Sequence, residues 1–217
     1  MRTVLVLEAR GVECVRGDRT LFSALDLALE AGQLLRVMGA NGVGKTSLLR
    51  ILCGLRAPSQ GAVLWSGNPI ARVREDFHQN LLYVGHLSGL KDDFSAIENL
   101  AGSSAIDGAD ADLAKILQAL DVLGVEHCSR IPVRHLSQGQ KRRVTLARLL
   151  LAAKRPLWIL DEPFNALDVR AVALVEGLLT AHAAAGGTVL FTTHLEPSID
   201  AIELTHLDLD RFATAAQ

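Results

Sequence analysis

The sequence contains no long hydrophobic run, since none of its apolar stretches approaches the ~18–20 residues that a membrane-spanning helix needs. The longest such stretch, residues 146–153, already includes Arg148. Residues 1–7 are followed by the charged side chains Glu8 and Arg10, which indicates a β-strand and not a signal peptide. If the protein works at a membrane, we therefore expect another subunit to hold it there.

Net charge and cysteine are also scarce. The 22 basic and 24 acidic side chains leave a formal net charge of −2, which gives no overall electrostatic reason to expect a nucleic-acid partner. The three cysteines, Cys14, Cys53 and Cys128, are an odd number without metal-ligand spacing, so we interpret them as reduced thiols packed in the core. Hydrophobic residues, at 49%, are abundant enough for a globular fold of one domain, with or without a small additional lobe.

A phosphate-binding P-loop is the first chemical motif in the chain. Residues 39–46, GANGVGKT, match the pattern G-x-x-x-x-G-K-[ST]. A Gly-rich turn without a ligand is the alternative, but a predicted strand over 34–38 and a predicted helix over 46–52 argue against it. We expect Lys45 to reach the β- and γ-phosphates and the Thr46 hydroxyl to bind Mg²⁺. The predicted nucleotide-binding residues of this loop are Gly39, Ala40, Asn41, Gly42, Val43, Gly44, Lys45, Thr46 and Ser47.

An acidic pair follows a short apolar strand later in the chain. Residues 157–160 are LWIL, and Asp161 and Glu162 come directly after them. Ligands of parallel α/β sheets collect at the carboxyl ends of the strands, which favours a position for both acids beside the nucleotide. We expect Asp161 to bind Mg²⁺ and Glu162 to polarise the attacking water; two solvated acids at a strand end are the alternative interpretation.

The motif LSQGQ, residues 136–140, lies about 20 residues before this strand and opens a predicted helix, with Ser137 and Gln140 in the pattern of a capping box. In this position it resembles the signature of the ATP-binding cassette (ABC) ATPases. The resemblance implies that Ser137 and Gly139 contact the γ-phosphate of an ATP held by a second copy of the chain, and that Gln140 belongs to the same site. One P-loop and one signature per chain then imply a head-to-tail homodimer.

Two further segments resemble ABC motifs. Residues 165–168, NALD, resemble the D-loop, which implies that Asp168 lies at the dimer seam and contributes to the composite ATP site. His194, after a predicted strand over 188–192, resembles the switch histidine that touches the γ-phosphate; an incidental surface histidine is the alternative. The three basic residues after the signature are interpreted as a solvated helix face and not as a nucleic-acid patch: Lys141, Arg142 and Arg143.

Two positions depart from the ABC pattern. His86 stands where the family's Q-loop has glutamine, which implies a place near the magnesium-bound water for a side chain that titrates near neutrality. Arg16 stands where an aromatic residue usually stacks on adenine; a guanidinium can stack on the base, or it can point into solvent.

Four segments resemble one branch of the family, the ATP-binding subunits (CcmA) of the c-type cytochrome biogenesis system. They are residues 16–22, 83–91, 98–100 and 156–168. The resemblance implies an enzyme that hydrolyses ATP with Mg²⁺ and lies as a peripheral subunit on the cytoplasmic face of a bacterial inner membrane. It also implies a CcmB-like membrane partner, with CcmC-like or CcmD-like subunits as further candidates, and a role in haem export or in release of a haem chaperone.

The order of predicted elements indicates an α/β fold. Strands alternate with helices at both ends of the chain, while a helix over 111–123 lies within a stretch that has few strand features. We predict one ABC-type P-loop NTPase domain over 1–217, with a mainly parallel sheet, an N-terminal antiparallel β part and an inserted helical subdomain. The expected boundaries are about 1–86 and 154–217 for the RecA-like core and about 87–153 for the helical subdomain.

Other functions stay open at this point. Another ABC export system would share most of these motifs, and a soluble ABC ATPase of translation or DNA repair is a second alternative. The remaining alternatives are a P-loop kinase and a nucleotide-binding module with little turnover. For the transporter subunit, residues 86–99 are the expected contact for the partner's cytoplasmic helices, with Leu90 and Phe94 either anchors there or part of the core of the helical lobe.

Overall fold

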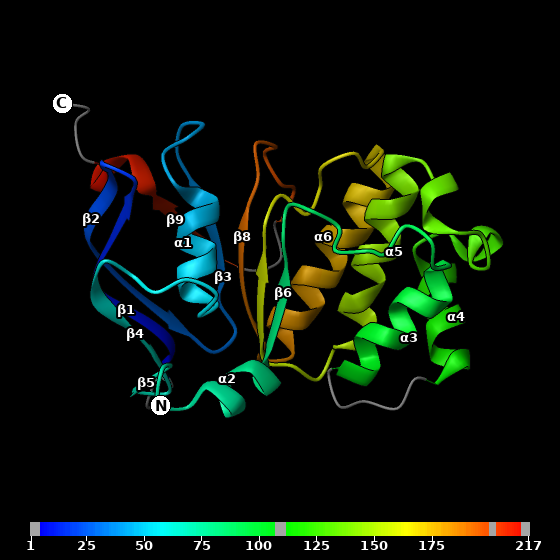
Figure 1. The fold of residues 1–217 in the computed structure, drawn as a ribbon, viewed down its shortest axis with the longest axis horizontal. Helices are drawn as coiled ribbons and strands as arrows, with labels where there is room; N and C mark the ends of the chain where they lie inside the picture. The colour runs from blue at the N-terminus through cyan, green and yellow to red at the C-terminus, as the bar shows by residue number, and fades with distance from the viewer. Residues whose placement is uncertain (1–4, 107–111, 200–202, 214–217) are drawn as a thin grey trace.

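The chain folds around two β-sheets with helices between and beside them (Figure 1). The computed structural model describes residues 5–106, 112–199 and 203–213. In Figure 1 the antiparallel sheet lies at the left, the parallel sheet in the middle and a group of helices at the right. This arrangement confirms the predicted fold class, a parallel sheet core with an antiparallel N-terminal part.

The antiparallel sheet has the strand order β2-β1-β4-β5. β1 (Leu5–Arg16) and β2 (Arg19–Glu30) form a long hairpin, in whose two-residue turn Gly17 has a φ of 61°, a conformation that favours glycine. β4 (Gln60–Trp65) pairs with β1, and the short β5 (Asn68–Pro69) pairs with β4.

The parallel sheet has the strand order β6-β7-β8-β3-β9. Every residue of β7 and β8 is buried, because helices or the other sheet cover both faces. The segments that follow these parallel strands therefore come together at the carboxyl edge of the sheet. The strands are β3 (Leu34–Met38), β6 (Leu81–Val84), β7 (Leu157–Leu160), β8 (Thr188–Thr192) and β9 (Leu204–Asp208).

Each face of the parallel sheet has its own hydrophobic core. On one face, α1 (Lys45–Leu52) lies between the two sheets and buries its apolar residues against Val37 and Ile159. On the other face, Trp158 and Phe191 pack in a second cluster with the remaining larger helices. Those helices are α3 (Ala96–Ile106), α4 (Leu113–Val122), α5 (Gln138–Leu151) and α6 (Val169–Ala184).

Some local predictions are confirmed and others are wrong. The three cysteines are buried and unpaired, and Ser137 and Gln140 form the predicted capping box. α2 (Arg74–Asn80), α3 and β9 were not predicted. Residues 1–4 of the expected N-terminal strand, and Ala111 at the start of the helix expected over 111–123, lie outside the described residues. The boundaries of the helical subdomain stay a prediction.

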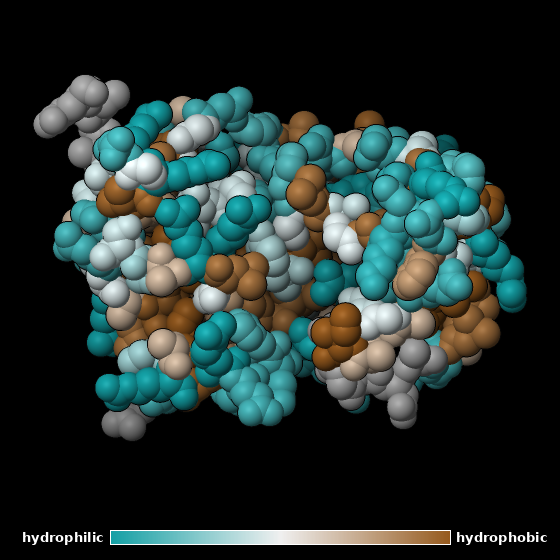
Figure 2. Space-filling model, viewed as in Figure 1, coloured by the Kyte–Doolittle hydropathy of each residue, from teal (hydrophilic) through white to brown (hydrophobic). Residues whose placement is uncertain are grey.

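Among the described residues, no helix combines the length and the hydrophobicity needed to cross a bilayer. Figure 2 shows one face that is mostly hydrophilic, with hydrophobic side chains gathered over the antiparallel sheet at the left. Leu87, which lies three residues after the end of β6, is an exposed apolar side chain, at 79% exposure.

A buried histidine is stacked in the second core. The His182 ring of α6 lies parallel to the Trp158 ring, with centroids 3.7 Å apart and an interplanar angle of 7°. A Cβ atom at Gly187 would lie 2.1 Å from His182 Nε2, so the chain needs glycine there. Burial lowers the pKa of His182, and a hydrogen bond to the backbone of Pro156 only partly offsets this effect.

This burial predicts a loss of stability at acidic pH. Above the unfolded-state pKa of about 6.5, His182 is neutral in both states and does not change stability with pH. As the pH falls below that value, the unfolded chain gains a proton that the folded chain takes up only at lower pH, so the folded state loses stability. Melting curves from pH 7.5 to 5.0 should show a smaller fall in Tm for His182→Phe than for the wild type. For a chain of this size, each kcal/mol of unfolding free energy shifts Tm by about 2–4 °C.

The matched control is His127→Phe, since His127 is exposed in the 3₁₀ helix Glu126–Cys128 and lacks such packing. Its Tm should fall with pH as the wild-type Tm does. Parallel Tm profiles for the wild type and His182→Phe would contradict the role of His182.

Candidate active site

One pocket of about 310 Å³ gathers most of the predicted site residues. They come from the ends of β1, β3, β6, β7 and β8, which meet at the carboxyl edge of the parallel sheet. Leu21 on β2 also lines the pocket and was not predicted. The predicted residues that line it are Arg16, Asn41, Gly42, Gly44, Lys45, Thr46, Ser47, His86, Asp161, Glu162 and His194.

The P-loop takes a conformation that requires its glycines. Gly39, Gly42 and Gly44 have φ values of 138°, 81° and 115°, which side chains rarely allow. α1 begins at Lys45, so the amides of its first turn point toward the pocket without intrahelical acceptors. Lys45 Nζ donates to the carbonyl oxygens of Gly39 and Ala40 over 2.7 and 3.2 Å. A cationic group and unpaired amides at one place are suited to bind phosphate.

One carboxylate oxygen of Asp161 is hydrogen-bonded and the other has no hydrogen-bond partner. Its Oδ1 atom accepts a 2.8 Å hydrogen bond from Thr192 Oγ1, while Oδ2 is buried without a hydrogen-bond partner. A side chain only 1% exposed rarely leaves such an atom unpaired, and a divalent cation would satisfy it. The residues present therefore fit Mg²⁺, with Thr46 and His86 on the same pocket.

The residues that the structure describes offer too few ligands of their own to enclose this ion. Within residues 5–106, 112–199 and 203–213, no group of three or more His, Cys, Asp or Glu side chains could hold a metal. Mg²⁺ is commonly held by one or two carboxylates together with substrate phosphates and water. The site thus suits Mg²⁺ that arrives with a nucleotide.

Glu162 is held in a backbone conformation that is unfavourable for a residue with a side chain. Its φ is 51°, which costs about 1–3 kcal/mol and persists only where surrounding contacts enforce it. Its amide donates to Thr192 Oγ1 over 2.9 Å, and its Oε1 atom lies 3.3 Å from His194 Nε2. The Thr192 hydroxyl thus binds both acids, a role that sequence reasoning missed although the residue ends a predicted strand.

The loop that carries His194 is anchored on two sides by charged residues. Arg36 is buried on β3, and its Nη1 atom lies 2.7 Å from Glu196 Oε2. This contact lowers the pKa of Glu196. The amide of Ser198 donates to Oε1 of Glu176, a buried residue of α6, over 2.8 Å. These two anchors fix the segment directly after His194.

Arg142 corrects the prediction of a solvated basic face. Its side chain is buried, at 6% exposure, and burial lowers its pKa while Asp161 and Glu162 act in the opposite direction. Lys141 and Arg143 are not simply solvated either, since they pair with Asp92 and Asp168. The helical period places Arg142 in line with Thr145, Leu146 and Leu149, which are all buried, and this pattern could have identified it.

The signature residues lie outside the pocket of this chain. The Gln140 amide donates to Ser137 Oγ over 3.2 Å, and the Ser137 amide donates to Gln140 Oε1 over 2.8 Å. A Cβ atom at Gly139 would lie 2.9 Å from the carbonyl oxygen of Ala166, so the close approach of the two loops requires glycine. Asp168 caps α6 through the amide of Ala171, and this bond is the main cause of its lowered pKa. Their contact with a second copy's ATP stays a prediction.

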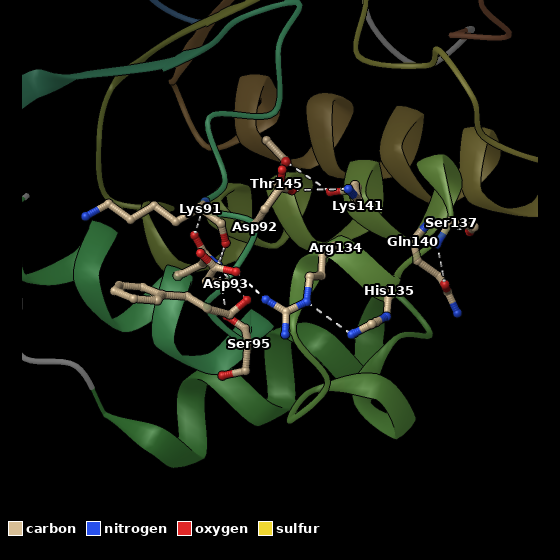
Figure 3. Close-up of polar contacts among 12 residues, drawn as sticks. Lys91, Asp92, Asp93, Ser95, Arg134, His135, Ser137, Gln140, Lys141 and Thr145 are labelled. Atoms are coloured by element: carbon tan, nitrogen blue, oxygen red, sulfur yellow. Dashed lines mark hydrogen bonds and ion pairs between the residues drawn. The ribbon is translucent and has the colours of Figure 1, made fainter.

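The start of the signature helix is tied to the loop that follows β6 (Figure 3). The Lys141 Nζ and Asp92 Oδ1 atoms are 3.3 Å apart, and Arg134 forms an ion pair with Asp93. The Thr145 hydroxyl donates to the carbonyl oxygen of Ser88 over 3.3 Å. The loop after His86 is therefore fixed against α5.

The C-terminal part of the chain also contacts the P-loop. Asp210, in the 3₁₀ helix Leu209–Phe212 after β9, accepts a hydrogen bond from the Ala40 amide at 3.1 Å for Oδ1 and 3.0 Å for Oδ2. The two residues are 170 positions apart, and no local pattern in residues 202–217 predicts this contact.

Comparison with known proteins identifies the class. A family model for ABC transporters matches residues 22–165, which is more than half of the chain. The chain therefore belongs to the ABC transporter family.

Its relatives define the branch. The cytochrome c biogenesis ATP-binding export protein CcmA of Nitrosospira multiformis is 49% identical over 203 residues, which are 94% of this chain and 98% of that protein. The protein of the same name from Escherichia coli K12 is 44% identical over 210 residues, with 97% and 99% covered. The family to which the chain belongs is thus, more narrowly, that of the CcmA proteins.

Solved structures share the fold. An ABC transporter ATP-binding protein from Pyrococcus furiosus gives a TM-score of 0.80 at 24% identity, covering 96% of this chain and 99% of its own. A dimeric ATP-binding cassette bound to ADP and Pi gives 0.79 at 22% identity, with 94% of both chains covered. At these identities the two structures show a common fold.

The contact of Asp210 with the P-loop predicts an effect on nucleotide affinity. A hydrogen bond of this kind contributes about 1 kcal/mol, so Asp210→Ala should weaken ATP binding about 5-fold by loosening the loop at Ala40. Titration of the full chain with a fluorescent ATP analogue measures the change in Kd.

The matched control is Asp26→Ala. Asp26 Oδ1 also accepts one backbone hydrogen bond, from the Gly11 amide at 2.7 Å, but Asp26 does not line the pocket. This variant should bind ATP as the wild type does. An equal loss of affinity in both variants would show that Asp210 acts through overall stability alone.

Proposed function

We propose that this chain is the ATP-hydrolysing subunit of an ABC transporter complex that energises c-type cytochrome biogenesis, by exporting haem or by releasing a haem chaperone. The convergence of Lys45, Asp161, Glu162 and His194 on one pocket carries the ATPase part of this proposal. Similarity to CcmA proteins over almost the whole chain supports the biogenesis part.

The pocket assigns a task to each group during hydrolysis. Lys45 exchanges its two loop carbonyls for phosphate oxygens of ATP. Asp161 Oδ2 and the Thr46 hydroxyl would hold Mg²⁺, which, when bound, neutralises charge on the β- and γ-phosphates. His194 and His86 line the space beside them.

Glu162 is the proposed general base. It accepts a proton from the water that attacks the γ-phosphorus, and ADP leaves from the opposite side. Both peptide groups that flank its α-carbon are hydrogen-bonded, to Thr192 and to Arg142, so the carboxylate is presented from a fixed backbone. His194 Nε2 lies beside Oε1 and orients it toward the nucleotide.

Two copies of the chain complete two ATP sites. Ser137, Gly139 and Gln140 lie outside the pocket of their own chain, as a composite site requires. In the proposed head-to-tail dimer they close over the ATP bound to the P-loop of the other copy, with Asp168 near the seam. Residues of about 87–153 then move as a lobe relative to the core.

A CcmB-like membrane subunit is the proposed partner, and the chain is a peripheral subunit on the cytoplasmic face of the inner membrane. The loop after His86 offers apolar contacts for such a partner. Leu87 is 79% and Phe94 44% exposed, with Lys91 Nζ 5.1 Å from the centre of the Phe94 ring. Leu90 is partly buried against the second core, which favours Phe94 as the anchor.

Replacement of Glu162 tests the catalytic assignment. Glu162→Gln keeps the size of the side chain and both backbone hydrogen bonds, so ATP binding should persist. Removal of the base should lower kcat for ATP hydrolysis at least about 10²-fold. Glu126→Gln, an exposed position in a 3₁₀ helix, serves as the control and should hydrolyse ATP at the wild-type rate. A Glu162→Gln rate equal to the wild-type rate would show that another group acts as base.

Capture of partners tests the biological role. Tagged Glu162→Gln protein with Mg-ATP should recover a CcmB-like protein and haem-chaperone components from solubilised inner membranes. An unrelated permease would keep the ATPase and remove the biogenesis role, and a purely soluble partner would overturn the transporter assignment.

A further inference from the structure

Arg142 binds only backbone carbonyl groups of the two segments that carry His86 and Glu162. Its Nη2 atom donates to the carbonyl oxygens of Asp161 and Glu162 over 2.9 and 2.7 Å. Its Nη1 atom donates to Gly85 over 3.1 Å, and Nε donates to Pro163 over 3.3 Å. One buried guanidinium thus joins the start of α5 to the residues around both predicted catalytic groups.

The hydrogen bond from Arg142 to Gly85 is one of a row of arginine–carbonyl hydrogen bonds along the edge of the parallel sheet. β6 is an edge strand, and its carbonyl groups alternate in direction. The Val84 carbonyl points toward β7 and accepts from the Asp161 amide at 2.8 Å. The carbonyls on the outer edge accept from three arginines of α5 and the segment after it. These pairs are Gly85 with Arg142, Tyr83 with Arg148, and Leu81 with Arg155.

This arginine row takes the place of a neighbouring strand. An edge strand leaves alternate backbone groups unpaired, which proteins commonly cover. On the outer edge of β6, opposite β7, the carbonyl groups accept from arginines of α5 and of the segment after it and not from another strand. Arg142 also reaches beyond the strand, to the loop of Glu162.

The conformation of Glu162 explains why this contact matters. Its φ of 51° places it in the left-handed region, where a non-glycine residue stays only if its neighbours fix it. Thr192 binds the amide of Glu162, and Arg142 binds its carbonyl. Loss of either contact lets the carboxylate move, and a displacement of about 1 Å can lower a reaction rate about 10²-fold.

We propose that Arg142 is a positioning residue. From the signature helix α5, it holds the backbone around Glu162 and His86 in place. Arg142 lies five residues after Ser137, about 7.5 Å along the helix axis. In the dimer, Ser137 and Gly139 contact the ATP of one site, whereas Glu162 and His86 act on the ATP of the other. Arg142 therefore links the two ATP sites within one chain. This inference rests on the proposed function.

A series of arginine variants tests the proposal on the full chain. Arg142→Met should lower kcat for ATP hydrolysis about 10–100-fold, while the Kd of a fluorescent ATP analogue changes less than about 3-fold, because Arg142 does not contact the P-loop. Arg142→Lys keeps the charge but lacks the planar fork, so its kcat should lie between those of the Met variant and the wild type. It also serves as the second variant if Arg142→Met fails to fold.

The matched control lies at the other end of the same row. Arg155→Met removes the donor to Leu81, so it should lower Tm but keep kcat within about 2-fold of the wild type, because Leu81 does not line the pocket. Hydrogen exchange adds a readout that does not depend on turnover. Exchange in residues 84–90 and 158–165 should accelerate in Arg142→Lys and not in Arg155→Met.

The outcomes separate this inference from the proposed function. A wild-type chain that neither binds nor hydrolyses ATP would overturn the proposed function, and this role with it. An active wild type whose Arg142 variants keep kcat and exchange rates would overturn the inference alone. Equal losses of kcat in the Arg142 and Arg155 variants at similar Tm would assign both arginines to stability only, which also overturns it.

Discussion

The register of the parallel sheet places the site residues beside one another. Val84 of β6 lies opposite Leu160 of β7, and Leu160 lies opposite Phe191 of β8. The next residues along these strands are Gly85, Asp161 and Thr192, from which the hydrogen bonds of the site arise. A slip of one residue in any pair would turn its side chains to the other face of the sheet. The site therefore depends on burial of both faces, which fixes this register.

Buried polar side chains hold the loops of Glu162 and His194 in place. Thr192 binds both acids, Arg142 binds the backbone around Glu162, and Arg36 with Glu176 anchors the loop after His194. Each of these residues is buried, where a polar group is costly unless it is paired. Hydrogen bonds in such surroundings are strong and directional, which suits groups that keep the Glu162 carboxylate in one orientation. The residues proposed to act in catalysis line the pocket themselves.

Patterns among residues close in sequence carry the local predictions. The P-loop, the acidic pair after 157–160 and the capping box of Ser137 all depend on contacts within a few positions. The positive φ of Gly17 in the turn between β1 and β2 follows from the same short-range rules. α3 escaped prediction, because its apolar residues, such as Leu100, are buried by α4 and α5 and show no clear periodic stripe of their own.

Contacts between residues far apart in the chain could not be predicted from the sequence. Asp210 reaches Ala40 across 170 positions, and Arg142 reaches Gly85 across 57. A run of basic residues after a signature motif has the composition of a solvated face, so only the packing of α5 against β6 reveals that one of them is buried.

The chemistry proposed for this protein follows from short motifs in its sequence. Motifs such as GANGVGKT specify which atoms can meet a phosphate, because backbone conformation and side-chain type over a few residues are local properties. The packing of the whole chain shows which groups hold those motifs in place and which of the motifs share one pocket. Those are distances between segments far apart in the chain, and they are set when strands and helices bury their apolar faces together.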